Sequence, residues 1–438
     1  MNPVMSLIYS ILRRMVRLGL IIYYKPYCLL HRARISTSAP TIFVGNHPNT
    51  MMDVFHPIAF SQLKVKFLGN AGLFANPLLS RFFKLFYTIK IERPQDSPGK
   101  LINNEQAFQE SIDHLKAKGN LYVAPEGSSY MNRQLRDVKT GTARIALWTA
   151  AQTNWSPDIT ILPVGISYQS PAQFRKGIVV SAAPILKVSD YRHRYHDDQQ
   201  ETVHQLTEDI EHALFAHSFS FMNEMDEIAI GGLIQSQLGE AIFYEANSFE
   251  KAINWRNQIL AIKENDPEAF SKFEAEWLEW KSEVRKHKFS QFLLNPYNLK
   301  SKGIGQNLPP LLRNLLIIIG QIQYAVPTFL LRQIVKKIDP YIGYNSTFYF
   351  AGGLFIYPIF FKAQAYLLAL LSGNWMLFWA YLIFAPLSSI IAHDLEAISA
   401  DNLLLLACDR AKFDQEYIRL KGEKEALIGR YFPFITQE

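Results

Sequence analysis

Short apolar runs alternate with helical patterns between residues 38 and 190. The runs have the length and β-branched composition of buried strands, and the segments between them repeat apolar residues at helical spacing, most clearly over 100–118 and 140–151. This alternation predicts an α/β domain with a largely parallel sheet flanked by helices, because parallel strands need helical crossovers. The predicted strands are Thr41–Gly45, Lys64–Gly69, Tyr87–Ile91, Asn120–Ala124, Ile159–Tyr168 and Ile178–Ala182.

The pattern changes after residue 197. Residues 197–300 are polar, rich in Glu, Lys, Gln and Trp, and helical in pattern, most clearly over Ser248–Phe289. They hold no catalytic motif that we recognise, so we expect a helical insertion or cap.

A hydrophobic region follows. Asn314–Leu331 is an uncharged run of 18 residues, Gly343–Phe361 is one of 19, and Ala363–His393 runs for 31 residues without Asp, Glu, Lys or Arg. A helix that crosses a bilayer needs about 20 predominantly apolar residues. The last run is interrupted near Gly373–Asn374 and suits the second half of a membrane hairpin. We expect membrane helices here; the alternatives are re-entrant helices and a hydrophobic soluble subdomain.

The N-terminus predicts an amphipathic helix. Arg13, Arg14 and Arg17 cluster on one side, and no small-residue cleavage site follows the apolar run Leu18–Tyr24, so a secretory signal is not expected. We expect this helix to lie in a membrane interface; the alternative is an ordinary amphipathic helix docked on the protein. The apolar positions at helical spacing are Leu7, Ile8, Ile11, Leu12, Met15 and Leu18.

Composition narrows the class of protein. Of 438 residues 49% are hydrophobic and 13% aromatic, which excludes global disorder. The net charge is +6, and the first 40 residues hold six basic residues and no acidic one, so the rest of the chain is near neutral. A basic arm of this kind suits anionic lipid headgroups. Nucleic acid is not an expected partner, because no folded segment carries a basic face.

Five regions follow from these patterns. The two cysteines, Cys28 and Cys408, are far apart and form no metal-ligand spacing, so no metal site is expected. The expected regions are an interface helix (1–37), a catalytic domain (38–215), a helical insertion or cap (216–300), hydrophobic membrane helices (301–400) and a helical tail (401–438).

The chemistry-bearing residues follow the predicted strands, where ligands gather in parallel sheets. The segment 45–53 reads Gly-Asn-His-Pro-Asn-Thr-Met-Met-Asp. An imidazole can accept a hydroxyl proton near neutral pH, and a carboxylate on its other nitrogen fixes the tautomer. If a helix begins at Met51, Asp53 lies in its first turn and can reach back to His47.

Four further segments carry candidate ligands. Arg93 ends a strand and can clamp a phosphate. Tyr122–Ser129 ends in Pro-Glu-Gly-Ser-Ser, a tight turn with exposed amides beside Glu126. Lys139 to Arg144 opens a helix whose amides and two cations can hold an anion. Ile161–Tyr168 is an apolar strand that either lines a pocket or packs in the core.

In this order the segments resemble the four blocks of the glycerolipid acyltransferase (PlsC-like) superfamily, over roughly residues 38–185. Those blocks are Asn-His-x4-Asp, a block ending in Arg, a Phe-Pro-Glu-Gly-Thr-Arg-Ser-like block and a Val-Pro-Val-like block. The resemblance implies that His47 is the general base, Asp53 its partner and Arg93 a phosphate ligand. It places Glu126 and Gly127 at the acceptor. The other expected substrate-binding residues are Ser128, Lys139 and Arg144.

Two departures affect the expected acceptor. Five residues, not four, separate His47 from Asp53, and block three reads Ala-Pro-Glu-Gly-Ser-Ser without the frequent Phe and Arg. The longer spacing with Asn-His-Pro-Asn resembles a subgroup related to fungal-type glycerol-3-phosphate and dihydroxyacetone-phosphate acyltransferases.

The expected function is therefore membrane O-acyltransfer in phospholipid biosynthesis, at the cytoplasmic face of the cell membrane. The donor is acyl-CoA or acyl carrier protein, the acceptor glycerol 3-phosphate or its 1-acyl form, and no cofactor is expected. Dihydroxyacetone phosphate or a lyso-aminolipid is an alternative acceptor. A non-catalytic lipid-binding protein is the alternative class. An acyl-serine route is disfavoured because no Gly-x-Ser-x-Gly elbow is present, and a nucleotide-binding protein because no Gly-rich phosphate loop is present.

Overall fold

The computed structural model describes residues 3–35, 40–70, 88–92, 104–296, 308–338, 342–411 and 414–436. Contacts divide the chain into two compact units. One is Met1–Glu227 with Ile242–Ile253, and the other is Ile228–Ala241 with Asn254–Glu438. This grouping follows contacts alone, so the domain boundaries inferred from the sequence stay predictions.

The described residues of the first unit form one eight-stranded sheet in the order β1-β7-β6-β2-β5-β3-β4, with β8 paired to β6. β2 lies between β5 and β6 and pairs with both in parallel. Among the described strands only the pairings of β6 with β7 and with β8 are antiparallel, so the predicted largely parallel sheet is confirmed. The strands are β1 (Tyr27–Leu30), β2 (Thr41–Gly45), β3 (Val65–Asn70), β4 (Thr88–Ile91), β5 (Asn120–Val123), β6 (Thr160–Tyr168), β7 (Ile178–Ala182) and β8 (Leu186–Lys187).

All six predicted strands are present, with Tyr87 of the third outside the described residues. The sequence reading missed β1 and β8. β1 is only four residues long and directly follows Lys25 and Pro26, so it shows no alternation of its own. It forms because it extends the sheet edge in parallel with β7, with Cys28 opposite Val179.

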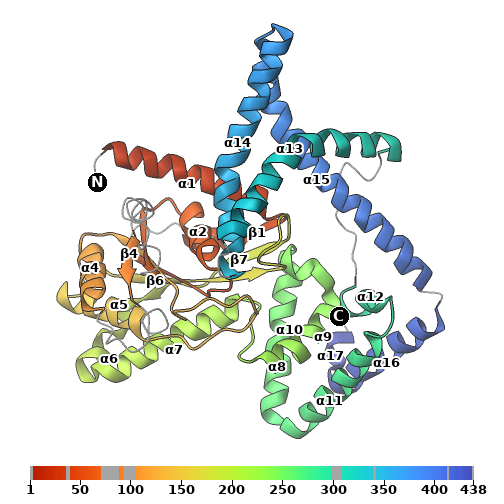
Figure 1. Cartoon of the computed structure of the whole chain (residues 1–438). Helices are drawn as coiled ribbons and strands as arrows, with labels where there is room; N and C mark the ends of the chain where they lie inside the picture. The colour runs from red at the N-terminus through yellow and green to blue at the C-terminus, as the bar shows by residue number, and fades with distance from the viewer. Residues whose placement is uncertain are drawn as a thin grey trace. The chain divides into compact units, whose positions relative to one another are not determined.

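Helices cover both faces of this sheet. Side chains at alternate positions of β2, such as Ile42 and Val44, pack with α5 and α7 into one apolar core. In Figure 1, α5 and α7 lie along one face and α1 and α2 along the other. The helices of this unit are α1 (Pro3–Tyr23), α2 (Met51–Phe60), α4 (Glu105–Lys116), α5 (Gly141–Gln152), α6 (Arg192–Asp197), α7 (Gln199–His217) and α8 (Glu224–Asp226).

The first helix, α1, leaves an apolar stripe exposed. The Arg13 guanidinium donates to the carbonyl of Ser61 at 3.0 Å, and that of Arg17 lies 5.1 Å from the ring centroid of Phe60. Two of the three arginines that the sequence places on one side of this helix therefore contact α2 or the residue that follows it. The exposed apolar side chains are Val4, Leu7, Ile11, Met15, Leu18 and Ile21.

The second unit contains a helical core made from segments on both sides of the hydrophobic region. Trp280 Nε1 donates to the carbonyl of Leu420 at 2.9 Å, and the rings of Phe273 and Phe432 meet edge to face at 4.7 Å. The buried ammonium of Lys424 donates to the carbonyl of Ser236 at 2.9 Å. The helices are α9 (Gly232–Leu238), the part of α10 (Ala246–Asn265) from Asn254 on, α11 (Pro267–Val284), α12 (Ser290–Leu294), α16 (Gln415–Tyr431) and α17 (Pro433–Thr436).

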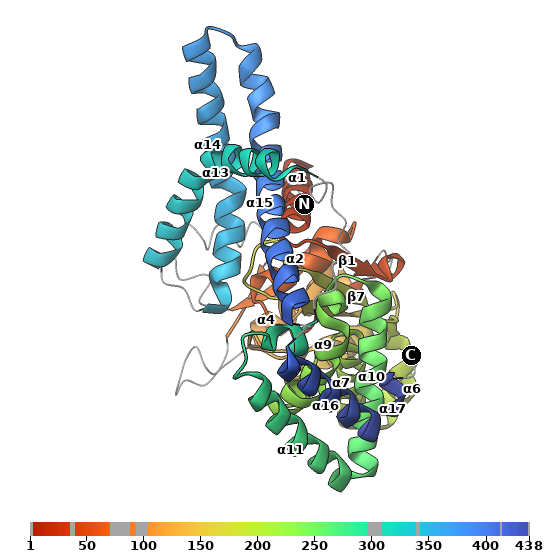
Figure 2. The same ribbon diagram turned by 90° about the vertical axis from the view of Figure 1, so that its right-hand side faces the viewer.

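The hydrophobic region forms α13 (Pro310–Ile338), α14 (Asn345–Ser372) and α15 (Met376–Ala411). Among the described residues these three helices, the third over Met376–Ser399, are long and apolar enough to cross a membrane. Gly373, at φ 64°, ends α14, so the break predicted near Gly373–Asn374 is confirmed. Figures 1 and 2 show α14 and α15 side by side as a hairpin.

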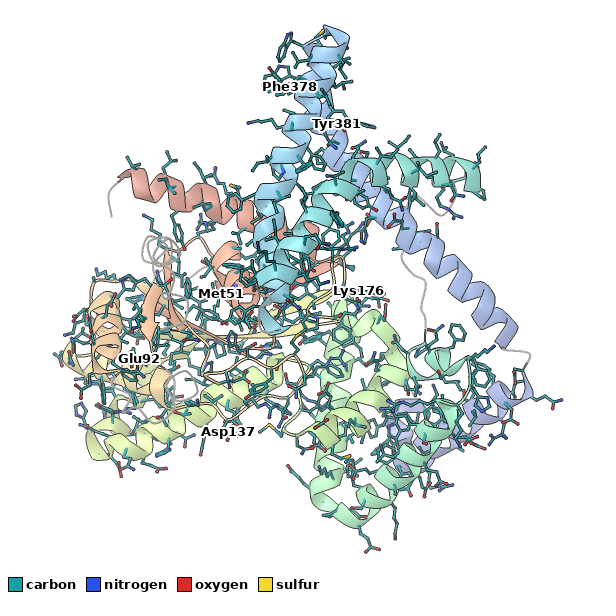
Figure 3. The ribbon with its side chains drawn as sticks, in the orientation of Figure 1. Met51, Glu92, Asp137, Lys176, Phe378 and Tyr381 are labelled. Carbon is teal, nitrogen blue, oxygen red and sulfur yellow. The ribbon has the colours of Figure 1, made fainter. Side chains whose placement is uncertain are left out.

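Polar side chains join these apolar helices. Gln323 of α13 is buried and accepts a hydrogen bond from Ser388 of α15 at 2.8 Å. Tyr324 donates to Glu396 at 2.8 Å, and Tyr381, labelled near the turn in Figure 3, donates to Gln364 at 3.5 Å. Such bonds hold helices together where apolar packing alone gives little preference.

We expect Gly165→Ala to destabilise the first unit strongly. A Cβ on Gly165 of β6 would lie 2.0 Å from the carbonyl oxygen of His217, so strand and helix must separate. The cost should be about 1–3 kcal/mol or more, as for overpacking in a core. Thermal unfolding of the detergent-solubilised protein measures it. Gly422→Ala is the control, because nothing lies within 4 Å of that position on α16. An equal change in both variants would contradict the close contact.

Candidate active site

The loop after β2 holds His47 and is anchored to β6. The side chain of Asn46 pairs with the main chain of Ile166, accepting from its N–H at 2.7 Å and donating to its carbonyl at 2.9 Å. The loop ends where α2 begins at Met51, the residue labelled in Figure 3. β2 has the predicted bounds and α2 begins at the predicted residue, so His47 lies at the carboxyl end of a central parallel strand.

His47 and Asp53 are in direct contact. His47 Nδ1 lies 3.1 Å from Asp53 Oδ2, and the Asp53 side chain is fully buried in the first turn of α2. Asp53 also accepts from the N–H of Asn49 at 2.6 Å and from the hydroxyl of Tyr168 at 2.7 Å. Burial raises the pKa of Asp53, and the hydrogen bonds from these three donors act in the opposite direction.

This contact assigns a tautomer to His47. An ionised Asp53 can only accept, so His47 Nδ1 carries the proton and Nε2 keeps a lone pair. The histidine side chain is 15% exposed. An imidazole held in this way is suited to take a proton from a hydroxyl.

The turn between the two residues has a strained backbone. Thr50 has φ 48° and ψ −125°, in the left-handed half of conformational space that β-branched residues rarely adopt. The strain of such a residue is about 1–3 kcal/mol. The hydroxyl of Ser129 accepts the N–H of Thr50 at 3.0 Å, which helps to hold the turn.

Glu126 ties two loops together. One carboxylate oxygen accepts the N–H of His47 at 2.7 Å and the other accepts the N–H of Arg136 at 3.1 Å. The side chain is buried, and burial raises the pKa of Glu126 to about 7. Each oxygen keeps a second lone pair, but the observed contacts position the backbone of the histidine loop.

The neighbouring predicted residues gather at the same turn. Gly127 has φ 72°, which explains a glycine here, and a Cβ on it would lie 2.7 Å from Lys139 Nζ. The N–H of Lys139 donates to the carbonyl of Pro125 at 3.1 Å, and its side chain is exposed. Ser128 is half-buried. One ammonium group therefore lies beside the Glu-Gly turn.

Two predicted cations are not brought into this cluster by the contacts we observe. Arg144 is exposed on α5, with its guanidinium 4.7 Å from the ring centroid of Trp148 and 5.7 Å from that of Phe108. Arg93 lies outside the described residues, so its role as a phosphate ligand stays a prediction.

Sequence reading missed several residues around the pair. Asn49 is buried, and its side-chain amide donates to the Tyr24 hydroxyl at 3.0 Å and to the carbonyl of Pro171 at 2.9 Å. Tyr122 is buried beside Gly45, and its hydroxyl has no hydrogen-bond partner among the described residues. The one sequence feature that could have identified Asn49 and Tyr122 is their position inside the segments that resemble the family blocks.

No group of three or more His, Cys, Asp and Glu side chains in the part of the chain described here is arranged to hold a metal ion.

Comparison with known proteins shows what this part of the chain is similar to. The model of the family described as Acyltransferase matches residues 30–167, which include β2 to β5, most of β6, and His47, Asp53 and Glu126. Tyr24, Tyr168 and Pro171 lie outside the match. Residues 30–167 are therefore similar to an acyltransferase domain. The resemblance inferred from the four blocks is therefore confirmed.

Two known proteins are similar to parts of this chain. Over 116 residues the chain is 33% identical to glycerol-3-phosphate O-acyltransferase 2 of Saccharomyces cerevisiae, covering 26% of this chain and 16% of that protein. This chain therefore matches only a small part of the relative's length. The crystal structure of the 1-acyl-sn-glycerophosphate (LPA) acyltransferase PlsC from Thermotoga maritima aligns with a TM-score of 0.35 and 15% identity, over 48% of this chain and 80% of that one.

We expect Glu126→Gln to destabilise the acyltransferase domain in a pH-dependent way. An amide has one oxygen, so one of the two N–H groups loses its acceptor, at a cost of about 1–3 kcal/mol. The folded pKa of Glu126, about 7, lies above the ordinary 4.5, so the folded state binds this proton more tightly. The raised pKa therefore stabilises the folded wild type fully below about pH 4.5, and this stabilisation is lost as pH rises through about 7.

Melting temperatures of both proteins across this pH range measure the effect. The difference in melting temperature between wild type and variant should become smaller as pH rises. Glu92→Gln is the matched control, because the Glu92 side chain is 41% exposed; Figure 3 labels this residue. A gap that does not depend on pH would exclude the raised pKa.

Proposed function

We propose that this chain transfers a fatty acyl group from a thioester to a hydroxyl of glycerol 3-phosphate or 1-acylglycerol 3-phosphate. The observation that carries the proposal is the buried Asp53 on Nδ1 of His47, 3.1 Å away, in a domain that matches the acyltransferase family. The domain match supports the reaction type, and the pair supplies a group able to start it.

In this mechanism His47 Nε2 removes the proton from the acceptor hydroxyl, while Asp53 stabilises the imidazolium through Nδ1. The alkoxide oxygen attacks the thioester carbonyl carbon and forms a tetrahedral oxyanion. The carbon–sulfur bond then breaks, and the thiolate leaves with the proton that His47 had taken. Acyl-CoA or acyl carrier protein is the proposed donor, and no resident cofactor takes part.

The acceptor is proposed from charge and from the relative's name. Arg93, Lys139 and Arg144 are cations within or beside the matched blocks, as a phosphorylated acceptor needs. The matched yeast protein is named a glycerol-3-phosphate O-acyltransferase, which makes glycerol 3-phosphate our first candidate. Glu126, Gly127 and Ser128 form the turn proposed to lie beside the acceptor. Dihydroxyacetone phosphate and a lyso-aminolipid are the alternatives.

We also propose that the protein works at a membrane, with the site on the cytoplasmic side where these thioesters are found. The apolar helices α13 to α15 support membrane association. The exposed apolar stripe of α1 supports a second contact, with the helix lying in the interface between headgroups and acyl chains.

We expect His47→Ala to lower acyl transfer by about 100-fold to 10,000-fold, the usual contribution of a general base. Full-length protein in detergent would be given labelled palmitoyl-CoA, or palmitoyl acyl carrier protein, with each candidate acceptor in turn. Product from one acceptor identifies the substrate.

His193→Ala is the control, because His193 is an exposed histidine of α6 in the same unit. It should leave the rate unchanged. Product that survives His47→Ala would remove the general-base role. No product from any acceptor and either donor would favour the non-catalytic lipid-binding alternative.

We expect the stripe on α1 to enter the lipid. In a variant without the two native cysteines, a cysteine at Ile11 would carry an environment-sensitive fluorophore, and one at exposed Gln200 of α7 would serve as control. In vesicles the label at position 11 should shift to the blue and be quenched by brominated lipids, unlike the label at 200. If brominated lipids quenched neither label, α1 would be shown to dock only on protein.

A further inference from the structure

Behind Asp53 lies a chain of hydrogen bonds that leads away from His47. Tyr168 donates to Asp53 Oδ1 at 2.7 Å, and the Tyr168 hydroxyl also lies 2.9 Å from His56 Nε2. The other ring nitrogen of His56, Nδ1, lies 2.7 Å from the hydroxyl of Tyr27. The residues come from β6, α2 and β1, so three separate elements meet here.

The direction of this chain follows from counting protons. Tyr168 has one hydroxyl proton, and Asp53, when ionised, can only accept it. At the contact with His56 the Tyr168 oxygen must therefore accept, so His56 carries its proton on Nε2. His56 Nδ1 is then a lone pair, and Tyr27 donates to it.

His56 has no second proton to upset this order. It is fully buried, and burial lowers its pKa to about 3, so the ring is neutral at ordinary pH. The rings of Tyr24, Tyr27 and Tyr168 enclose it. Their centroids lie 5.6 Å, 5.5 Å and 5.7 Å from the centroid of the His56 ring. Packing of this kind leaves the ring little freedom to turn over.

Reversing the chain requires a neutral Asp53. If Asp53 Oδ1 carried a proton and donated to Tyr168, then Tyr168 would donate to His56 Nε2 and His56 Nδ1 would donate to Tyr27. A proton on His56 Nδ1 would therefore mean that Asp53 Oδ1 carries a proton, whereas a proton on Nε2 means that Oδ1 accepts from Tyr168.

We propose that Tyr168 and His56 are positioning residues for His47, because their one-way chain keeps Asp53 ionised and so keeps the proton of His47 on Nδ1. Neither residue touches the reacting atoms; both act through Asp53. This inference rests on the proposed role of His47 as base, but the chain itself can be observed without any substrate.

Other titratable and charged groups act on the same pair. Tyr24, Tyr122 and Glu126 interact electrostatically with Asp53, and Arg17 with Tyr27. Lowering the number of donors on Asp53 makes the coupled His47–Asp53 pair hold a proton more tightly, whichever of the two carries it. The pair should then lose its basic form at a higher pH.

The first experiment needs no activity. The full-length protein labelled with ¹⁵N-histidine in lipid bilayers would be studied by solid-state NMR, with the His56 signals, among those of 11 histidines, assigned by their loss in His56→Gln. We expect His56 to be neutral with the proton on Nε2, and His47 to be protonated at Nδ1 in its neutral form. A proton on Nδ1 of His56, or a charged ring, would overturn the proposal.

The second experiment measures acyl transfer against pH in Tyr168→Phe. Loss of one donor to a buried carboxylate should move the acidic limb of the pH profile of kcat to a pH about one unit higher. At pH values below the midpoint the rate should therefore fall about tenfold, and KM should stay nearly unchanged. Tyr27→Phe leaves the donor on Asp53 in place and should shift the limb less. Tyr195→Phe, at a buried tyrosine of α6, is the control.

The outcomes separate the two hypotheses. An acidic limb that stays in place in Tyr168→Phe, with or without a lower rate, would overturn the positioning role. If the wild type showed the expected His56 tautomer but transferred no acyl group to any acceptor, the proposed function would be wrong. The chain of hydrogen bonds would still be established.

Discussion

The burial of one carboxylate governs the architecture around this site. A buried Asp53 must be matched by donors, since an unpaired charge in the interior is very costly. The donors come from the backbone of Asn49, the ring of His47 and the hydroxyl of Tyr168. Two of these donors come from the loop between β2 and α2, and the third comes from the end of β6. The strained Thr50 backbone is one cost of bringing them together.

Two departures from the resembled acyltransferase pattern are connected here. One more residue than in the usual spacing separates His47 from Asp53, and the turn that holds it places Thr50 at positive φ with an N–H directed at Ser129. Ser129 stands in block three, where the pattern frequently has Arg. A hydroxyl can accept that N–H and a guanidinium cannot. The changed spacing and the changed side chain therefore suit each other.

The sequence predicted what local pattern determines. The bounds of β2, the start of α2, the place of Asp53 in its first turn and the hairpin break at Gly373 all follow from periodicity and turn residues. β1, and with it Tyr27, was missed because four residues show no period. The bond from Glu126 to the N–H of His47 was not predictable, since it joins loops 79 positions apart that meet only when β2 and β5 pair. Fold class came from many residues together, whereas these contacts depend on single side chains.

The helical core of the second unit restricts how the chain passes through a bilayer. α11 precedes α13 to α15 and α16 follows them, yet Trp280 bonds to the main chain of Leu420 and Arg430 of α16 pairs with Glu276 at 2.9 Å. Segments that share one core lie in one aqueous compartment. Three crossings would leave α11 and α16 in opposite compartments. Parity therefore allows only an even number of full crossings among the three helices: two of them cross, or none does.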